Sequence, residues 1–280
     1  MTEKPSDTSR IGFIGGGNMA SSLIGGLIAE GHPKTALKVS EPNAAQRESL
    51  GQRFGITTLT ENADLAANSD MVVLAVKPQV LRPVCEQLAR AVQKRRPLIL
   101  SIAAGIRAAD IDEWLGGGLP VIRAMPNTPA LLRAGATGLF ANPSVSASER
   151  NLAEAVMSSV GDVLWLPDET QMDLVTGLSG SGPAYFFLIL EALEQVAVDA
   201  GLSPDIARRL AGQTALGAAQ MVLESGEDPA ILRQNVTSPG GTTEHGLRVL
   251  HREGVQRAMR EAVLAATDRA RKLAELFAKD

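Results

Sequence analysis

The sequence has little of several features that mark specialised classes of protein. Its 280 residues include one cysteine, Cys85, so an intramolecular disulfide is excluded and a reducing compartment, the cytoplasm, is expected. No apolar run approaches the roughly 18 residues that a membrane-spanning helix needs. The polar opening segment, residues 1–9, lacks the apolar region of a signal peptide, and we predict that it is a disordered tail.

A surplus of charge of one sign is also missing. Lysine and arginine number 27 against 31 aspartate and glutamate residues, which leaves a formal net charge of −4. This balance gives no general electrostatic attraction to nucleic acid or to an anionic membrane, so we expect neither as a partner. Any anionic ligand must therefore be bound locally, by particular loops. We also expect no metal site.

The hydrophobic residues that are present, 45% of the chain, are arranged in two different patterns. From Ile11 to about Trp165, short aliphatic runs alternate with helix-length amphipathic stretches, which is typical of a parallel sheet with crossover helices. After Pro167 the strand-like runs stop, and helical patterns follow that are interrupted near residues 203–204, 226–229, 239–241 and 254. The predicted strands are residues 11–14, 37–40, 56–59, 71–76, 98–103, 121–124, 137–140 and 163–166.

Two of the predicted helices carry apolar surface in different arrangements, on most sides of one and as a single seam along the other. The helix from Pro183 to about Ala200, with Ser181 as its predicted N-cap, is apolar on most sides and should be buried on most sides. We hypothesise that part of this surface is a homodimer interface. In the last helix, apolar residues recur every three or four positions: Met259, Val263, Ala266, Ala270, Leu273 and Phe277.

The first predicted strand runs directly into the glycine turn Gly15-Gly16-Gly17 and then into a helical pattern, with Ala20 at the third small position. This is the context in which a G-x-G-x-x-A sequence binds a dinucleotide. Gly15 permits the tight turn, and Gly17 lets the pyrophosphate approach the backbone. The pattern predicts NADPH or NADH as a cofactor.

The end of the second strand leaves the choice between these two cofactors open. Glu41 could accept hydrogen bonds from both hydroxyls of the adenosine ribose, which favours NADH. Ser40, Asn43 and Arg47 could instead hold the 2′-phosphate of NADPH.

Turns after other strands should line the same ligand crevice, because it lies at the carboxyl ends of the strands. Ala75-Val76-Lys77-Pro78 is expected beside the adenosine and pyrophosphate, and Ala103 and Asn127 are expected to flank the nicotinamide. Pro126 and Pro129 bracket Asn127 and should stiffen its loop.

A second anion-binding pattern lies late in the chain, at Val236-Thr237-Ser238-Pro239-Gly240-Gly241-Thr242-Thr243, immediately before a helical pattern. Glycines allow backbone N–H groups to close on a ligand, and the first helical turn adds unpaired donors and the positive end of its dipole. With a cofactor at the first glycine loop, this second loop predicts a small carboxylate or phosphate substrate.

The helical part offers no convincing general acid or base, because His245 and His251 suit structural or solvated roles better, as does His32 in the turn after the first helix. Oxidation of an alcohol normally needs such a group. Reduction of a carbon–nitrogen double bond needs it less, since an iminium carbon is already electrophilic. The missing residue therefore favours an imine substrate.

Five ordered motifs together resemble pyrroline-5-carboxylate reductase over essentially the whole chain after residue 9. They are Gly15-Gly16-Gly17-Asn18-Met19-Ala20, Ala75-Val76-Lys77-Pro78, Met125-Pro126-Asn127-Thr128-Pro129, Gly177-Leu178-Ser179-Gly180-Ser181-Gly182-Pro183-Ala184-Tyr185 and Val236 to Thr243. The resemblance implies reduction of 1-pyrroline-5-carboxylate to L-proline by NAD(P)H, the last step of proline biosynthesis. It also implies an α/β fold class, with a Rossmann-type domain at 10–167 and an all-α dimerisation domain at 168–280, whose dimers assemble further, with a decamer of five dimers as one form.

The resemblance also assigns site residues. It implies that Ser238, Gly240, Gly241, Thr242 and Thr243 hold the substrate carboxylate, and that the Thr243 hydroxyl lies near the ring nitrogen as the catalytic group. Together with Asn62, which matches a family position near the adenosine phosphate, the cofactor residues are expected to be Ile14, Gly15, Gly16, Gly17, Asn18, Met19, Ser40, Glu41, Asn62, Ala75, Val76, Lys77, Pro78, Ala103 and Asn127.

Glu41 departs from the pattern of NADPH-preferring relatives, which places the preference between the two cofactors in doubt. The alternative function is another imine reductase or a β-hydroxyacid dehydrogenase-like enzyme. That dehydrogenase class needs a catalytic lysine on the long interdomain helix, and there is no lysine between Ser179 and Ala200. A nonenzymatic nucleotide-binding protein is a further alternative, which the three hydroxyls of the second loop disfavour.

Overall fold

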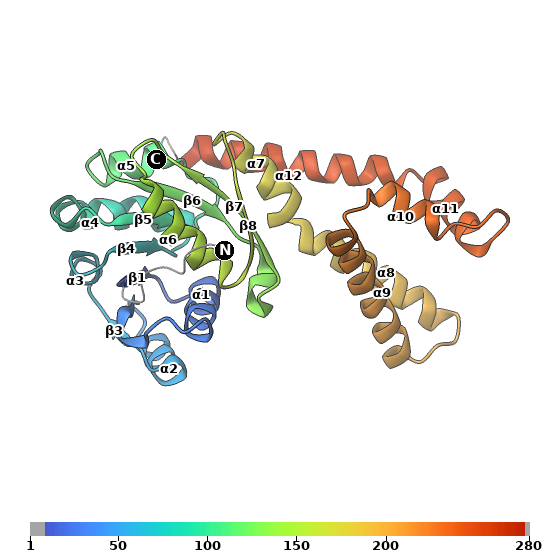
Figure 1. Cartoon of the computed structure of the whole chain (residues 1–280), viewed down its shortest axis with the longest axis horizontal. Coiled ribbons are helices and arrows are strands. Elements are labelled where there is room, and N and C mark those ends of the chain that lie inside the picture. Colours follow the sequence, from blue (N-terminus) through green and yellow to red (C-terminus); the bar gives the residue numbers. More distant parts are fainter. Residues whose placement is uncertain (1–8, 278–280) are drawn as a thin grey trace. The chain divides into compact units, whose positions relative to one another are not determined.

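The computed structural model describes residues 9–277, so the predicted tail lies outside the described residues except for Ser9. The chain divides into two compact units, shown in Figure 1. The larger comprises the described residues up to Ser181 together with those from Leu264 onward, and the smaller is Gly182–Val263. The larger unit thus keeps the chain until Ser181 and includes it again in the last helix, whereas the domain division after residue 167 is based on sequence pattern and stays a prediction.

The larger unit is built on an eight-stranded sheet with the order β3-β2-β1-β4-β5-β6-β7-β8. The central pairs are parallel and in register, so that Ile14 at the end of β1 lies opposite both Ser40 of β2 and Leu74 of β4. The strands are β1 Ile11–Ile14, β2 Leu37–Ser40, β3 Thr57–Leu59, β4 Met71–Leu74, β5 Leu98–Ser101, β6 Val121–Met125, β7 Gly135–Ala141 and β8 Gly161–Trp165. All eight lie where the sequence predicts strands, and they differ from the predicted bounds only at their ends.

Helices cover both faces of the sheet, as a Rossmann-type fold requires. One apolar core joins the strands to α1 (Asn18–Ala29), α2 (Ala44–Phe54) and α6 (Ala147–Ser158). The other joins them to α3 (Asn62–Ala67), α4 (Leu81–Arg95) and α5 (Ala108–Trp114). Three short 3-10 helices complete the connections: η1 Lys34–Ala36, η2 Pro78–Val80 and η3 Thr128–Leu132.

The sheet is mostly parallel, as predicted, with one antiparallel pair. Strands β6 and β7 are antiparallel, with Arg123 opposite Phe140, while β7 and β8 are parallel again. Only the short η3 segment separates β6 from β7, and a parallel crossover needs a dozen or more residues. The short connection therefore forces the chain to reverse direction.

The smaller unit is helical, and the predicted interruptions lie at the junctions between its helices. They are α8 Gly182–Asp199, α9 Pro204–Ser225, α10 Pro229–Asn235, α11 Thr242–Arg252 and the first part of α12 Val255–Phe277. No helix in residues 9–277 is long and apolar enough to cross a membrane.

The predicted N-cap at Ser181 is wrong. α7 (Gln171–Val175) is followed by a π-helical turn, η4 (Thr176–Gly180), and Ser181 itself has helical backbone angles. Its N–H donates to the carbonyl of Thr176, so it continues the preceding turn and starts no new helix.

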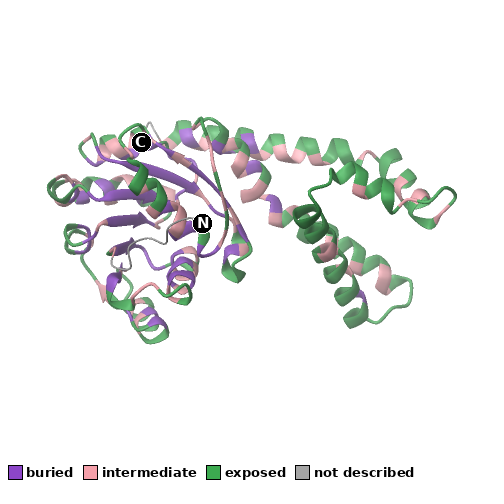
Figure 2. Cartoon of the chain, in the orientation of Figure 1, coloured by how far each residue is buried: buried purple, intermediate pink, exposed green. Residues whose placement is uncertain are grey.

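The predicted burial of α8 is also wrong for a single chain. Phe186, Phe187 and Leu188 are each more than 60% exposed, and Figure 2 shows the helices of the smaller unit as largely exposed. The apolar seam of α12 has a different outcome, because its last turns return to the larger unit. There Ala270 is buried, and Phe277 packs against the core of α3, α4 and α5.

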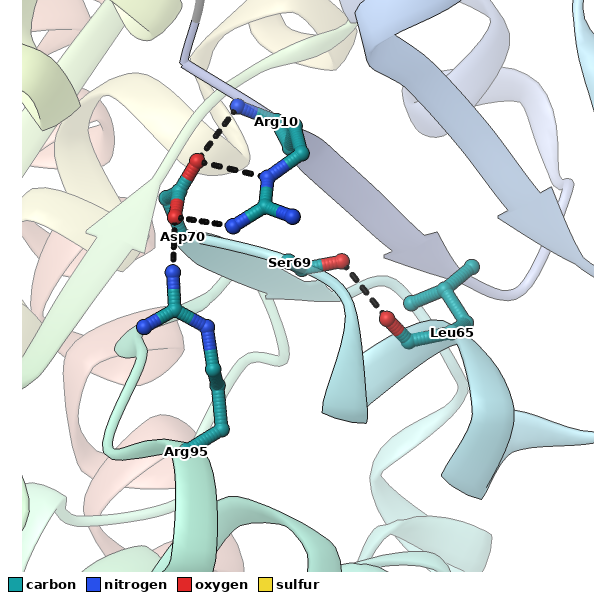
Figure 3. A network of polar contacts seen from close by, with 5 residues as sticks. All are labelled: Arg10, Leu65, Ser69, Asp70 and Arg95. Carbon is teal, nitrogen blue, oxygen red and sulfur yellow. Dashed lines mark hydrogen bonds and ion pairs between the residues drawn. The ribbon is translucent and has the colours of Figure 1, made fainter.

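A polar cluster ties together the starts of β1 and β4, as Figure 3 shows. The carboxylate of Asp70 accepts hydrogen bonds from the backbone N–H of Arg10 (2.9 Å) and from its Nε (3.1 Å) and Nη2 (2.9 Å), and a further one from Arg95 at the end of α4. Nearby, the buried hydroxyl of Ser69 donates to the carbonyl of Leu65. The cluster links two adjacent strands to a helix that covers them.

The hydrogen bonds of Asp70 predict that its contribution to the free energy of unfolding is lost in acid. Hydrogen bonds from Arg10 hold the pKa of Asp70 below its usual value. Such a carboxylate stabilises the fold fully above its unfolded pKa of about 4, and this contribution is lost as the pH falls through the lower folded value. Asp70→Asn is expected to lower the free energy of unfolding by about 1 kcal/mol at neutral pH and by less in acid, measured by urea unfolding.

Asp162→Asn is the matched control, because Asp162 lies exposed on β8 and forms no ion pair in the described part of the chain. It should leave the unfolding free energy nearly unchanged at every pH. A loss for Asp70→Asn that stays constant as the carboxylate protonates would contradict an electrostatic contribution.

Candidate functional site

The turn after β1 has a shape that only glycine allows. Gly15 has φ of +95°, and a Cβ built on it would lie 2.7 Å from the carbonyl oxygen of Ala75. Its N–H donates to the carbonyl of Ser40 (2.8 Å), and the N–H of Ala75 donates to the carbonyl of Ile14 (2.9 Å). The glycine turn, the end of β2 and the turn after β4 are therefore in direct contact, as the sequence predicts.

The start of α1 is suited to an anionic group. Gly17 is the N-cap residue in extended conformation, and no side chain of the described residues caps the helix there. No acidic residue occupies the first turn, which begins with Asn18 and Met19. A Cβ built on Gly17 would meet no atom within 4 Å, so the space in front of these unpaired N–H groups is open. These features fit the pyrophosphate of a dinucleotide.

Glu41 follows β2 directly and is bound by two backbone amides. Its Oε2 accepts from the N–H of Gly16 (3.0 Å) and its Oε1 from the N–H of Asn43 (3.0 Å). Nη1 of Arg47 donates to the carbonyls of Glu41 (2.7 Å) and Pro42 (2.8 Å). The carboxylate of Glu41 is thus held beside the glycine turn, and the guanidinium of Arg47 is held against the backbone of the loop after β2.

Ser40 and Asn62 are brought together at the end of β2. Ser40 is fully buried, and its hydroxyl donates to Oδ1 of Asn62 (2.6 Å) at the start of α3. The hydroxyl of Ser40 therefore binds within the protein, while Asn62 stays partly exposed.

The remaining predicted cofactor residues end the other central strands. Val76 and Pro78 are partly exposed and Lys77 is exposed, so this turn borders solvent beside Gly15. Ala103, after β5, is buried, and its N–H donates to Oγ of Ser101 (3.3 Å).

Asn127 has its side-chain amide fixed at both ends. Its Nδ2 donates to the carbonyl of Ser179 in η4 (3.1 Å), and its Oδ1 accepts from the N–H of Ala136 in β7 (2.9 Å). The sequence predicts a fixed amide here, and the structure shows that protein groups hold it. Asn127 therefore connects the loop after β6 to η4.

Sequence reasoning missed a buried ion pair in the larger unit. Arg123 in β6 is almost fully buried and donates from Nη1 to Oε1 of Glu169 (2.7 Å), which also accepts from the N–H of Ala108 (2.7 Å). Burial raises the pKa of the nearby Asp173, while Arg123 opposes this increase. The available signal was a charged residue inside an otherwise apolar strand.

The second predicted loop precedes α11 in the smaller unit. Gly240 has φ of +70°, and the N–H of Gly241 donates to the carbonyl of Ser238 (3.0 Å), which closes the turn. The first intrahelical bond is made by the N–H of His245, so the N–H groups of Thr242 and Thr243 precede it and have no helical partner.

The side chains of this loop divide into bound and unbound groups. Glu244, which the sequence reasoning missed, accepts from the N–H of Gly240 through Oε2 (2.8 Å), and Nδ1 of His245 contacts the carbonyl of Gly241 (3.0 Å). The structure gives no hydrogen bond, within its described residues, to the hydroxyls of three residues: Ser238, Thr242 and Thr243. Three exposed hydroxyls beside a helix N-terminus suit a small carboxylate.

Two family models match the sequence. One, described as pyrroline-5-carboxylate reductase dimerisation, matches residues 169–273. The other, described as NADP oxidoreductase, coenzyme F420-dependent, matches residues 10–105. They correspond to the helical part of the chain and to the first half of the sheet.

Named proteins are similar to this chain over nearly its whole length. A pyrroline-5-carboxylate reductase of Pseudomonas aeruginosa is 51% identical over 268 residues, which are 96% of this chain and 98% of that protein. The structure of a pyrroline-5-carboxylate reductase from Coxiella burnetii has a TM-score of 0.91 and 44% identity, and the match covers 95% of this chain and 99% of that one.

A Plasmodium falciparum pyrroline carboxylate reductase, solved with NADP bound, has a TM-score of 0.86 and 28% identity, and the match covers 96% of this chain and 99% of that one. Sequence and fold thus lead to the same group of enzymes. With half of its residues identical to those of a pyrroline-5-carboxylate reductase over almost the full length of both proteins, this chain belongs to the pyrroline-5-carboxylate reductase family.

Proposed function

We propose that this enzyme, which reduces 1-pyrroline-5-carboxylate to L-proline with NAD(P)H, binds the cofactor on the larger unit and the substrate carboxylate at the loop before α11. The observation that carries the assignment of the loop is its set of three hydroxyls that have no hydrogen-bond partner among residues 9–277, beside the N–H groups of α11 that precede its first helical bond. The alternative of another imine reductase or a β-hydroxyacid dehydrogenase-like enzyme is not favoured by the named relatives.

The cofactor part of the proposal rests on the turn after β1. The open space at Gly17 and the uncapped start of α1 suit the pyrophosphate, and Ala75 to Pro78 border the same turn. We assign Ile14 to Met19, Ser40, Glu41, Asn62, Ala103 and Asn127 to the same site, with Ser40 and Asn127 acting through the loops that they hold. The bound cofactor supplies the hydride.

The substrate part of the proposal divides the loop into two roles. The hydroxyls of Ser238 and Thr242 bind the carboxylate, Gly240 and Gly241 form the turn that leaves room for it, and the hydroxyl of Thr243 hydrogen-bonds to the ring nitrogen. Hydrogen bonds to a charged acceptor are stronger than neutral ones, so the carboxylate is the main anchor. Because the imine carbon is electrophilic, orientation of the ring is the protein's main task.

Glu244 adds a constraint to this site. Its carboxylate occupies the N–H of Gly240, so it stabilises the loop and lies at the same helix terminus as the proposed substrate site. We propose that the substrate carboxylate uses the N–H groups of Thr242 and Thr243, which Glu244 does not occupy.

We also propose that the chain forms a homodimer through its helical part, and that such dimers assemble into larger rings such as a decamer. Within the described residues, no residue of α10 or α11 is buried, and α8 leaves large apolar side chains exposed. Large apolar side chains exposed in this number support an interface there.

We also propose a cytoplasmic location, because a single cysteine fits a reducing compartment.

The thiol of Cys85 is buried, and burial raises its pKa to about 12, because the thiolate would lose its hydration. This thiol therefore stays protonated and suits no catalytic role.

The activity is tested by adding 1-pyrroline-5-carboxylate to the purified chain with NADH and, separately, with NADPH. We expect oxidation of at least one cofactor with stoichiometric formation of L-proline. No proline with either cofactor, from protein that is folded by circular dichroism, would contradict the proposed function.

Thr243→Ala tests the role of one hydroxyl. We expect kcat to fall roughly a hundredfold, as for loss of one positioned donor, with the fold retained. Thr243→Ser keeps the hydroxyl and should recover most of the rate. If the serine variant is as slow as the alanine variant, the hydroxyl is not the functional group.

Ser238→Ala and Thr242→Ala test the carboxylate anchor. Each should raise KM for the substrate by about tenfold or more and change kcat less, because a hydrogen bond to a charged group is worth about 1.5–3 kcal/mol. Steady-state kinetics measure the split between the two constants. Unchanged KM values in both variants would remove these hydroxyls from the site.

Leu188→Glu tests the interface. A charge on the exposed apolar face of α8 should raise the dimer dissociation constant by at least about tenfold, measured by sedimentation velocity over a concentration series. Leu132→Glu is the matched control, because Leu132 is also highly exposed but lies on η3 of the larger unit. Equal behaviour of the two variants would count against an interface on α8.

A further inference from the structure

The loop after β2 contains the residues that decide how the adenosine ribose is read. Because β1 and β2 are parallel and in register, with Ile14 opposite Ser40, Glu41 is the first residue beyond the strand end nearest to the glycine turn. In dinucleotide-binding folds this is the position from which the ribose hydroxyls are recognised. Whether a 2′-phosphate can be accepted depends on the groups present here.

The carboxylate of Glu41 is fixed and still able to accept hydrogen bonds. One oxygen binds the N–H of Gly16 and the other binds the N–H of Asn43, each at 3.0 Å. An ionised carboxylate has about four acceptor positions, so these two bonds leave one on each oxygen. The side chain is partly exposed. A pair of adjacent hydroxyl donors, as on an unmodified ribose, matches two free acceptors.

The groups that the end of β2 offers to a 2′-phosphate make hydrogen bonds within the protein. The hydroxyl of Ser40 is fully buried and donates to Asn62, and the Oδ1 of Asn43 accepts from the N–H of Gln46 as the N-cap of α2. Nη1 of Arg47 donates to the carbonyls of Glu41 and Pro42. The Ser40 hydroxyl and the Asn43 Oδ1 are therefore used within the protein, and Arg47 is held to the loop through Nη1.

We infer that Glu41 makes this chain select NADH over NADPH, by accepting hydrogen bonds from the ribose hydroxyls and by repelling a 2′-phosphate. This inference rests on the proposed function only in placing a nicotinamide dinucleotide at the glycine turn. The two backbone amides prevent the carboxylate from turning away from a phosphate without loss of both hydrogen bonds. The penalty on the phosphate is electrostatic, so salt should reduce it.

The test is direct binding of the oxidised cofactors NAD+ and NADP+ to the full chain by isothermal titration calorimetry, which requires no substrate. Wild type should bind NAD+ at least about tenfold more tightly than NADP+, a difference of about 1.4 kcal/mol. Glu41→Gln, which keeps an acceptor and removes the charge, should reduce this ratio several-fold. Glu41→Ser should bring the ratio close to one. Higher salt should narrow the ratio in wild type and leave it unchanged in Glu41→Ser.

Glu48→Gln is the matched control, since Glu48 is an exposed residue of α2 whose carboxylate bonds only to Gln52 among the described residues. It should keep the wild-type ratio. Because Glu41 also holds the amide of Gly16, its substitution can weaken both cofactors. Equal weakening, with an unchanged ratio, would show a structural role alone and overturn the inference, as would equal or tighter binding of NADP+ to wild type.

The result of the cofactor-binding test can be distinguished from the result of the test for proline formation. Proline formation with a preference for NADPH would overturn this inference and leave the reductase activity intact. Selective binding of NAD+ by a chain that forms no proline would contradict the activity and support the role of Glu41.

Discussion

The cofactor side of this protein depends on the parallel register of three adjacent strands. Ile14 lies opposite both Ser40 and Leu74, so the turns that follow β1, β2 and β4 emerge at one level of the sheet. At that level Gly15 approaches the carbonyl of Ala75 so closely that no side chain fits. A displacement of one strand by one residue would separate these turns and expose the wrong side chains, because neighbouring residues of a strand face opposite sides of a sheet.

Polar side chains then fix the loops that the strands bring together. Glu41 connects the glycine turn to the loop after β2, Asn127 connects the loop after β6 to η4, and Glu244 holds the amide of Gly240. Each uses a carboxylate or an amide to bind backbone groups that loops leave unpaired. Sites held in this way are ordered before a ligand arrives, which lowers the entropy that binding must offset.

The helical part follows a different principle. Its helices carry more apolar surface than a single chain buries. The loop before α11 joins α10 to α11, and neither helix has a buried residue among those described. In the larger unit the same kind of residue is buried between sheet and helices. The larger unit thus buries its apolar side chains within one chain. In the smaller unit, the dimer that we propose would bury them.

The sequence by itself determined the positions of the strands and helices, the glycine turns after β1 and before α11, and the family, because each depends on local periodicity or on short motifs. It did not determine the reversal between β6 and β7, the helical conformation of Ser181, or the exposure of α8, since these follow from connection length and from which surfaces meet. Only the tertiary structure decided which polar groups are engaged. Along the chain Glu41 favours NADH while Ser40 and Arg47 favour NADPH, and the hydrogen bonds that separate their roles join residues that folding brings together.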